Sequence, residues 1–188
     1  MALNIIDNSE VKKSSVMQKD GTYSTAQGGT ELMNKALYER VDNALVDQFN
    51  IIKSRVREVV ETKPKILWLH DLWSDPEAQH LKDASSRSKF EKLVFVSNWQ
   101  FQTYNLALGV PFSQSFILKN AIDPIEYKEK QKDQIRLIYH TTPHRGLALL
   151  VPVMEELAKH HGDKVHLDVY SSFEAYGWPQ RDEPYLDL

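Results

Sequence analysis

The chain has 188 residues and a net charge of −3; 41% of its residues are hydrophobic and 26% are charged, a mixture typical of a globular protein with room for one full domain and part of another. The slightly acidic balance argues against a broad nucleic-acid interface, which depends on an excess of lysine and arginine. The chain contains no cysteine, which excludes disulfides, thiolate metal sites and cysteine nucleophiles, and no apolar run reaches the ~20 residues that cross a bilayer.

The first predicted helix follows a pair of glycines. Residues 14–25 are polar and predict a loop. Gly28 and Gly29 come next, and they allow the backbone to approach a ligand closely or to adopt a positive φ. Thr30 is then of the type that caps a helix N-terminus. The helix itself is predicted by apolar residues at helical spacing, namely Leu32, Met33, Leu37 and Val41.

Short apolar runs predict strands along the rest of the chain. The predicted strands are residues 49–52, 65–69, 92–96, 115–118, 135–139 and 165–170. Residues 54–62 predict a helix or a turn. A helix is predicted at 99–108, because Gly109 and Pro111 follow it as stop signals.

The last third of the chain starts with a predicted linker at 123–134, which contains a proline and many Lys and Glu residues. A helix is predicted at 145–160, where Pro152 marks either a kink or the true first turn. The tail at 178–188 shows no strong pattern.

Strands that alternate with helices predict an α/β fold with a Rossmann-like parallel sheet. In such sheets, ligands bind at the carboxyl ends of the strands. Polar residues follow the predicted strands repeatedly at these ends. They are His70, Asp71, Ser97, Asn98, Asn120, His140, Thr141 and Thr142.

Arg145 and Gly146 stand where a strand end and a helix start coincide. The free N–H groups and positive dipole of a helix start favour an anion such as a diphosphate, and arginine binds phosphate oxygens with two parallel hydrogen bonds. Each predicted site residue also has a purely structural interpretation: His70 as a hydrogen-bonded strand-end residue, Asp71 and Asp75 as caps, and Gly28 with Gly29 as a simple helix start.

Several common site motifs are absent from the sequence. Neither GxGxxG nor a P-loop follows the glycine pair. His140 and His144 are four residues apart across a proline-containing loop, without the HExxH pattern or a third ligand of a zinc site, so no metal site is predicted. The GxSxG elbow of a serine hydrolase is also missing.

The chain resembles GT-B glycosyltransferases of the large retaining group called family 4, especially glycosyltransferase-like proteins of marine phages and cyanobacteria. The strings that support this resemblance are QGGTELM at 27–33, ILWLHDLWSDPE at 66–77, KLVFVSNWQFQTY at 92–104, LGVP at 108–111, LKNAIDP at 118–124 and IYHTTPHRGLALLVPV at 138–153. They cover most of the chain in the family's order.

The resemblance implies an acceptor-type Rossmann-like domain with its linker at 1–130 and a partial donor-type domain at 131–188. It matches Gly28 and Gly29 to the glycine loop near the donor phosphates, and His70 to a histidine that touches the transferred sugar. Arg145 and Gly146 match the pair whose cation neutralises the leaving diphosphate.

Two further matches depart from the family pattern. The stretch from Asn120 to Asp123 corresponds to an NGxD segment, with Ala121 in place of glycine. His140 stands where the family usually has a second arginine. The family's E-x7-E element lies further downstream than residue 188, which predicts a truncated second domain and weak or no activity alone.

The resulting hypothesis is a retaining transfer of sugar from a nucleotide-sugar donor to an unknown glycan acceptor, with the nucleotide-sugar as substrate and no cofactor. The alternatives are a non-catalytic sugar- or phosphate-binding module, or another GT-B enzyme such as an epimerase or phosphorylase. A homodimer is the expected assembly. The N-terminus MALNIIDNSEVKK lacks the pattern of a secretory signal, which predicts a cytoplasmic protein.

Overall fold

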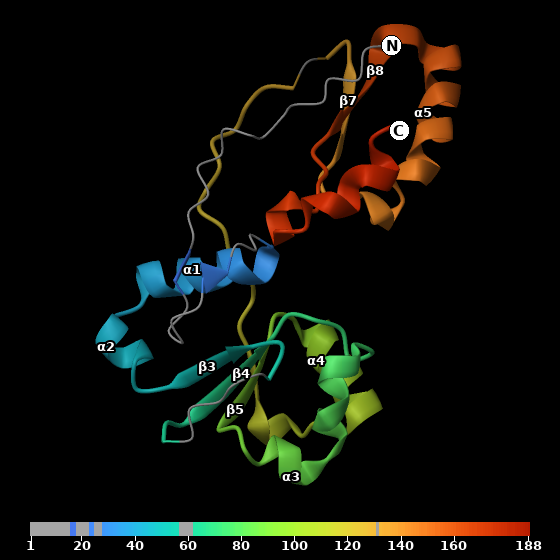
Figure 1. Ribbon diagram of the computed structural model, residues 1–188. Helices are drawn as coiled ribbons and strands as arrows, with labels where there is room; N and C mark the ends of the chain where they lie inside the picture. Colours follow the sequence, from blue (N-terminus) through green and yellow to red (C-terminus); the bar gives the residue numbers. More distant parts are fainter. Residues whose placement is uncertain (1–15, 18–22, 25–27, 57–61, 131) are drawn as a thin grey trace. The chain divides into compact units, whose positions relative to one another are not determined.

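The computed structural model describes residues 16–17, 23–24, 28–56, 62–130 and 132–188 (Figure 1). The chain divides into two compact units. The first comprises residues 29–124 and is called the 29–124 unit. The second comprises residues 1–28 and 125–188 and is called the C-terminal unit. Each unit contains its own parallel strands.

The 29–124 unit is built on a four-stranded parallel sheet with the order β3-β4-β5-β6 (Figure 1). Its strands are β3 (Asn50–Lys53), β4 (Lys65–Leu69), β5 (Lys92–Phe95) and β6 (Ser115–Ile117). All four match predicted strands to within one residue at each end. The α/β, Rossmann-like fold class is therefore confirmed for this unit.

Helices and short 3-10 turns connect these strands. They are α1 (Gly29–Arg40), α2 (Asn43–Val46), η1 (Pro76–Lys82), α3 (Ala84–Arg87), α4 (Asn98–Leu108) and η2 (Phe112–Gln114). The prediction that Thr30 caps α1 was wrong, because this helix already begins at Gly29. The prediction of a cap at Asp75 is confirmed: its carboxylate accepts a hydrogen bond from the Glu77 N–H at 2.8 Å.

The main hydrophobic cluster of this unit lies on one face of the sheet. Side chains alternate between the two faces of a strand, which places Leu67 and Leu69 of β4 on the same face as Leu93 and Phe95 of β5. They pack with buried residues from the connecting segments, among them Leu81, Phe90, Tyr104 and Leu108. Full burial of each Leu or Phe side chain contributes about 1.5–3 kcal/mol.

Helix α4 has well-defined signals at both ends. The Ser97 hydroxyl accepts a hydrogen bond from the Gln100 N–H at 3.0 Å and caps its N-terminus. Gly109 ends the helix with φ 67°, a left-handed conformation that glycine adopts without strain. The predicted stop at Gly109 is confirmed.

The C-terminal unit contains a βαβ arrangement. Strands β7 (Ile135–Tyr139) and β8 (Val165–Val169) are parallel neighbours, and α5 (Leu147–His161) connects them (Figure 1). Arg136 joins the two strands through hydrogen bonds of 2.8–3.1 Å to the Asp168 carboxylate. Both predicted strands are confirmed, the second one residue shorter than expected.

The predicted helix at 145–160 needs a correction. Pro143–Arg145 forms a 3-10 turn, η3, and α5 starts only at Leu147. Gly146, with φ 103°, separates the two elements because this backbone conformation is open mainly to glycine. Pro152 lies inside α5, so it does not mark the first turn.

Two other segments differ from expectation. Within the predicted loop at 14–25, β1 (Val16–Met17) pairs antiparallel with β2 (Tyr23–Ser24). The tail at 178–188, where no pattern was predicted, contains the 3-10 turn η6 (Pro179–Tyr185), and another 3-10 turn, η5 (Glu174–Tyr176), precedes it. The helix or turn predicted at 54–62 lies largely outside the described residues.

Candidate functional site

Four predicted site residues of the 29–124 unit lie at the carboxyl edge of its sheet. The β4–β5 register pairs Leu69 with Phe95. His70 and Asp71 therefore follow β4 on the same edge where Ser97 and Asn98 follow β5. The structure thus brings four predicted residues to one edge, as the sequence pattern indicated.

Two buried side chains of α4, Gln100 and Tyr104, fix this edge by hydrogen bonds. We call this pair the strand-end clamp. The Gln100 amide donates to the Leu69 carbonyl at 3.2 Å and to the Asp71 carbonyl at 2.8 Å. Its Oε1 accepts from the Val96 N–H at 2.8 Å. The Tyr104 hydroxyl donates to the Asp71 carbonyl at 3.1 Å.

Both clamp residues are almost fully buried, with 3% of Gln100 and none of Tyr104 exposed. Burial is the largest cause that raises the pKa of Tyr104, followed by the charges of Asp71 and Asp75, so its hydroxyl stays a donor. The backbone that surrounds His70 is consequently held by hydrogen bonds that water cannot easily replace.

Ser54 provides the third restraint on this edge. Its hydroxyl oxygen accepts a hydrogen bond from the His70 N–H at 2.9 Å, and its own N–H donates to the Trp68 carbonyl at 2.8 Å. Ser54 has φ 54°, and among the described residues it is the one non-glycine residue with a positive φ. This conformation costs about 1–2 kcal/mol for an L-residue.

The imidazole of His70 has polar atoms without partners. Both ring nitrogens are buried, and neither forms a hydrogen bond within the described part of the chain. The ring lies against Trp68, with centroids 4.6 Å apart and planes tilted by 50°. Burial lowers the pKa of His70, an effect that Asp71, Glu31 and the Trp68 carbonyl only partly offset. The ring is therefore neutral at pH 7, with one donor and one acceptor to offer a ligand.

Further unpartnered atoms belong to the same region. The indole N–H of Trp68, whose residue is only 5% exposed, has no hydrogen-bond partner among the described residues. Glu31, in the first turn of α1, acts electrostatically on His70, and Asn34 follows Glu31 by one helical turn. The Asn34 side-chain oxygen is also buried and unpartnered in the described structure. Unpaired buried polar atoms are uncommon in proteins and need an explanation.

The glycine pair is placed less favourably for a phosphate. Gly28 directly precedes α1, and Gly29 is its first residue. A side chain at Gly29 would meet nothing within 4 Å, so no protein atom requires glycine there. Glu31 also adds a negative charge to the same helical turn, which disfavours an anion.

Four predicted residues of this unit have structural environments. Ser97 caps α4, and Asn98 is the exposed first residue of that helix. Asp123 forms an ion pair with Arg40 of α1 at 2.5 Å. Asn120 is exposed in the segment after β6. Ser97 and Asn98 share the sheet edge with His70, but no hydrogen bond or ion pair among the described residues joins any of the four to the His70 ring.

The predicted phosphate residues of the C-terminal unit lie between β7 and α5. Arg145 is exposed, and Gly146 precedes the helix. The Tyr139 hydroxyl donates to the Thr142 carbonyl at 2.9 Å and to the Pro143 carbonyl at 3.3 Å. The loop that precedes α5 is therefore fixed by hydrogen bonds within the unit itself.

The loop after β7 is held by the segment after β8. The Ser171 hydroxyl donates to the Thr141 carbonyl at 2.6 Å, and Thr142 is buried. His140 is exposed. The Thr141 and Thr142 carbonyls thus accept hydrogen bonds that stabilise the protein itself.

An aromatic cluster that the sequence did not predict follows β8. His144 stacks on Phe173, with centroids 5.1 Å apart and planes 18° apart. The Arg181 guanidinium lies 4.4 Å from the centroid of the Phe173 ring. Asp182 anchors the turn by accepting from the Phe173 N–H at 2.8 Å and from the Ser172 hydroxyl at 2.5 Å. The interacting groups come from the short segments 171–173 and 181–183. The contacts between these two segments depend on the fold, so the local sequence does not predict them.

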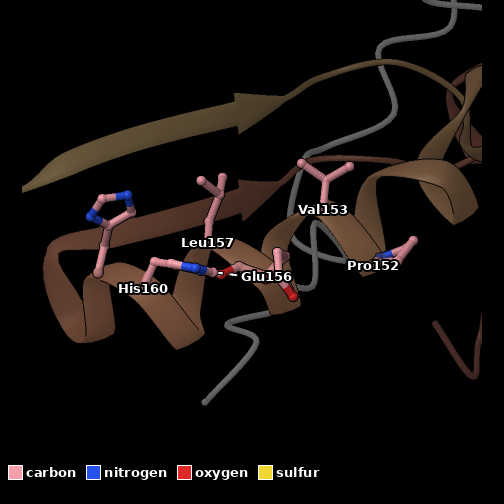
Figure 2. Close-up of a pocket in the computed structure, with 6 residues that line it drawn as sticks. Pro152, Val153, Glu156, Leu157 and His160 are labelled. Carbon is pink, nitrogen blue, oxygen red and sulfur yellow. Dashed lines mark hydrogen bonds and ion pairs between the residues drawn. The ribbon is translucent and has the colours of Figure 1, made fainter.

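A groove of about 400 Å³ lies along α5 and contains none of the predicted site residues (Figure 2). Its lining residues are Pro152, Val153, Glu156, Leu157, His160 and His161. His160 Nδ1 lies 2.9 Å from the Glu156 carbonyl, so the polar groups here are engaged within the helix. The groove is mostly apolar and offers no obvious chemistry.

The described residues contain no group of three or more histidine, aspartate and glutamate side chains placed to hold a metal ion. In the same residues, no helix is long and apolar enough to span a membrane. The chain matches no known protein-family model and no curated protein sequence.

Proposed function

We propose that the chain is a glycosyltransferase whose His70 contacts the sugar of a nucleotide-sugar donor. The observation that supports this most strongly is the neutral imidazole with two buried, unpartnered nitrogens at the carboxyl edge of the sheet. Sugar hydroxyls both donate and accept hydrogen bonds, so one hexose satisfies both nitrogens. The nearby Glu31 and Asp71 favour a neutral group over an anion.

In this reaction the bond between the anomeric carbon and the diphosphate oxygen breaks, and a bond to an acceptor hydroxyl oxygen forms. The diphosphate departs with the bonding electrons, and its oxygen takes up the proton of the acceptor hydroxyl. Arg145 belongs to the C-terminal unit and is proposed separately as a ligand of a nucleotide phosphate, since no ion pair or hydrogen bond occupies its guanidinium among the described residues.

The test is isothermal titration of the chain with a panel of UDP- and GDP-sugars, comparing wild type with His70→Ala. We expect at least a tenfold loss of affinity in the variant. His80→Ala is the matched control, because His80 is also a partly buried histidine with a lowered pKa but belongs to η1. Equal affinities of wild type and His70→Ala would contradict the proposed contact.

Arg145 is tested separately by Arg145→Gln, with Lys159→Gln as an exposed cation control on α5. We expect only Arg145→Gln to weaken binding of free UDP or GDP. Unchanged affinity for both nucleotides would remove Arg145 from the proposal and leave the His70 contact untouched.

A second candidate is a sugar-binding module without transfer activity. It is favoured by the loop between β7 and α5, because the Thr142 and Thr141 carbonyls accept hydrogen bonds from Tyr139 and Ser171 and the polar groups of this loop thus stabilise the protein itself. This candidate predicts donor binding that depends on His70 but releases no nucleotide diphosphate in the presence of glycan acceptors. Release of UDP or GDP with sugar transfer would exclude it.

A further inference from the structure

Ser54 occupies the position where the β3–β4 ladder ends. In a regular parallel ladder, a residue donates its N–H to one carbonyl of the partner strand. Its own carbonyl then accepts from the N–H of the residue two positions further along that strand. Ser54 donates its N–H to the Trp68 carbonyl at 2.8 Å. The continuing pattern would then have the His70 N–H donate to the Ser54 carbonyl.

The structure shows a different acceptor at this point. The His70 N–H donates to the Ser54 hydroxyl oxygen at 2.9 Å. The positive φ of Ser54 turns the main chain out of the strand, and the side chain takes over the acceptor role of the carbonyl. The Arg55 N–H then bonds back to the Lys53 carbonyl at 2.5 Å, which completes the turn.

The change of acceptor from the Ser54 carbonyl to the Ser54 hydroxyl matters because this hydrogen bond holds His70. His70 keeps its strand-like register although β3 no longer runs beside it. Its ring remains against Trp68 with both nitrogens unpartnered in the described chain. Non-glycine residues with positive φ persist only where the surroundings stabilise them, and they concentrate at functional sites.

We propose that Ser54 is a positioning residue that holds His70 in its ligand-binding orientation. Its hydroxyl fixes the His70 backbone, while its turned main chain ends β3 before it passes His70. The proposal rests on the proposed function only for the ligand that His70 meets. The geometric part concerns the ligand-free chain and stands by itself.

The test separates the hydroxyl from the backbone conformation. Ser54→Gly removes the hydroxyl but relieves the strain of the positive φ, so this variant folds even if Ser54→Ala does not. Amide hydrogen exchange of His70 and the NMR titration of its imidazole are measured in the ligand-free proteins. We expect exchange at the His70 amide to accelerate at least tenfold and the imidazole pKa to move, with thermal stability close to wild type.

Ser86→Ala is the matched control. The Ser86 hydroxyl lies 2.6 Å from His80 Nδ1, so its removal disturbs another histidine away from the strand ends. We expect this variant to leave the His70 amide and imidazole unchanged. Wild-type exchange and titration of His70 in Ser54→Gly would overturn the proposal, because the glycine carbonyl would then have restored the regular ladder.

A second measurement tests ligand binding by isothermal titration with the same panel of UDP- and GDP-sugars. If wild type binds a donor, Ser54→Gly is expected to bind it about tenfold more weakly and Ser86→Ala equally well. Equal affinity in Ser54→Gly would overturn the positioning role. Absence of binding by wild type would contradict the proposed function, while the exchange and titration data would still decide the role of Ser54.

Discussion

The strand ends of the two units use similar polar residues in different ways. In the 29–124 unit, Gln100, Tyr104 and Ser54 satisfy the backbone, and the His70 ring is left without a partner. In the C-terminal unit, the hydroxyls of Tyr139 and Ser171 donate to the carbonyls of Thr142 and Thr141 in the loop that precedes α5. Polar residues at a strand end therefore indicate a site only when some of their atoms remain unsatisfied.

The largest expected effect comes from the strand-end clamp. Gln100→Met keeps the length of the side chain but removes its amide. The Val96 N–H and the Leu69 and Asp71 carbonyls then lose their hydrogen bonds to residue 100. Since each buried group left unsatisfied costs about 1–3 kcal/mol, we expect a loss of about 3 kcal/mol in the free energy of unfolding. Urea unfolding measures this loss.

The control for the clamp is Gln102→Met, at an exposed position of the same helix. It is expected to change the free energy of unfolding by less than about 0.5 kcal/mol. Similar effects of the two substitutions would show that the Gln100 amide does not stabilise the strand ends.

In the C-terminal unit, Phe173→Leu preserves an apolar side chain but removes the ring between His144 and Arg181. We expect a loss of about 1.5 kcal/mol, because aromatic stacking adds about that much beyond area burial. The His144 ring protons should also lose the shift caused by the Phe173 ring current. An unchanged His144 spectrum would contradict the stacked geometry.

A smaller effect is expected from Tyr139→Phe, which removes one hydroxyl from the start of α5. The loss should be about 1 kcal/mol, the usual net value of a hydrogen bond. Tyr170→Phe is the control, because this partly exposed hydroxyl has no hydrogen bond within the described chain. If both variants were equally stable, the hydroxyl of Tyr139 would not stabilise the loop that precedes α5.

The smallest effect concerns pH. Burial lowers the pKa of His70 in the folded chain, so the unfolded chain binds a proton more readily. Stability is therefore unaffected well above pH 6.5 and falls as the pH drops from about 6.5 toward the lowered folded pKa. His80 contributes in the same direction.

His70→Gln should make this fall shallower without abolishing it, because His80 remains. Urea midpoints of wild type and variant at pH 7.5 and 5.5 measure the difference. Identical pH dependence would mean that His70 titrates equally in the folded and unfolded chains.

The sequence predicted the strands well, because buried parallel strands form short apolar runs that stand out from their polar neighbours. It also predicted the edge where His70 and Asp71 lie. The 3-10 turns after β8 were missed, since their stability comes from contacts such as Arg181 with Phe173 and not from local periodicity.

The residues that hold the site were missed for a similar reason. Nothing in the local sequence marks Ser54 for a positive φ, and its partner His70 is 16 residues away. Gln100 did have a signal. Ser97 and Gln100 have the spacing of a capping box, and the first half of that motif is formed by the 3.0 Å bond from the Gln100 N–H to the Ser97 hydroxyl. The Gln100 amide, however, turns toward Val96 and β4 instead of the Ser97 N–H.

The Gln100 amide has a consequence for the substitutions that this position tolerates. It accepts from one backbone N–H and donates to two carbonyls at once, so the position demands an acceptor and a donor at the tip of a side chain of fixed length. Glutamate provides no donor when ionised, methionine provides neither strongly, and asparagine is one methylene shorter. Among random variants selected only for folding, glutamine should recur at position 100 while the neighbouring exposed position 102 drifts freely.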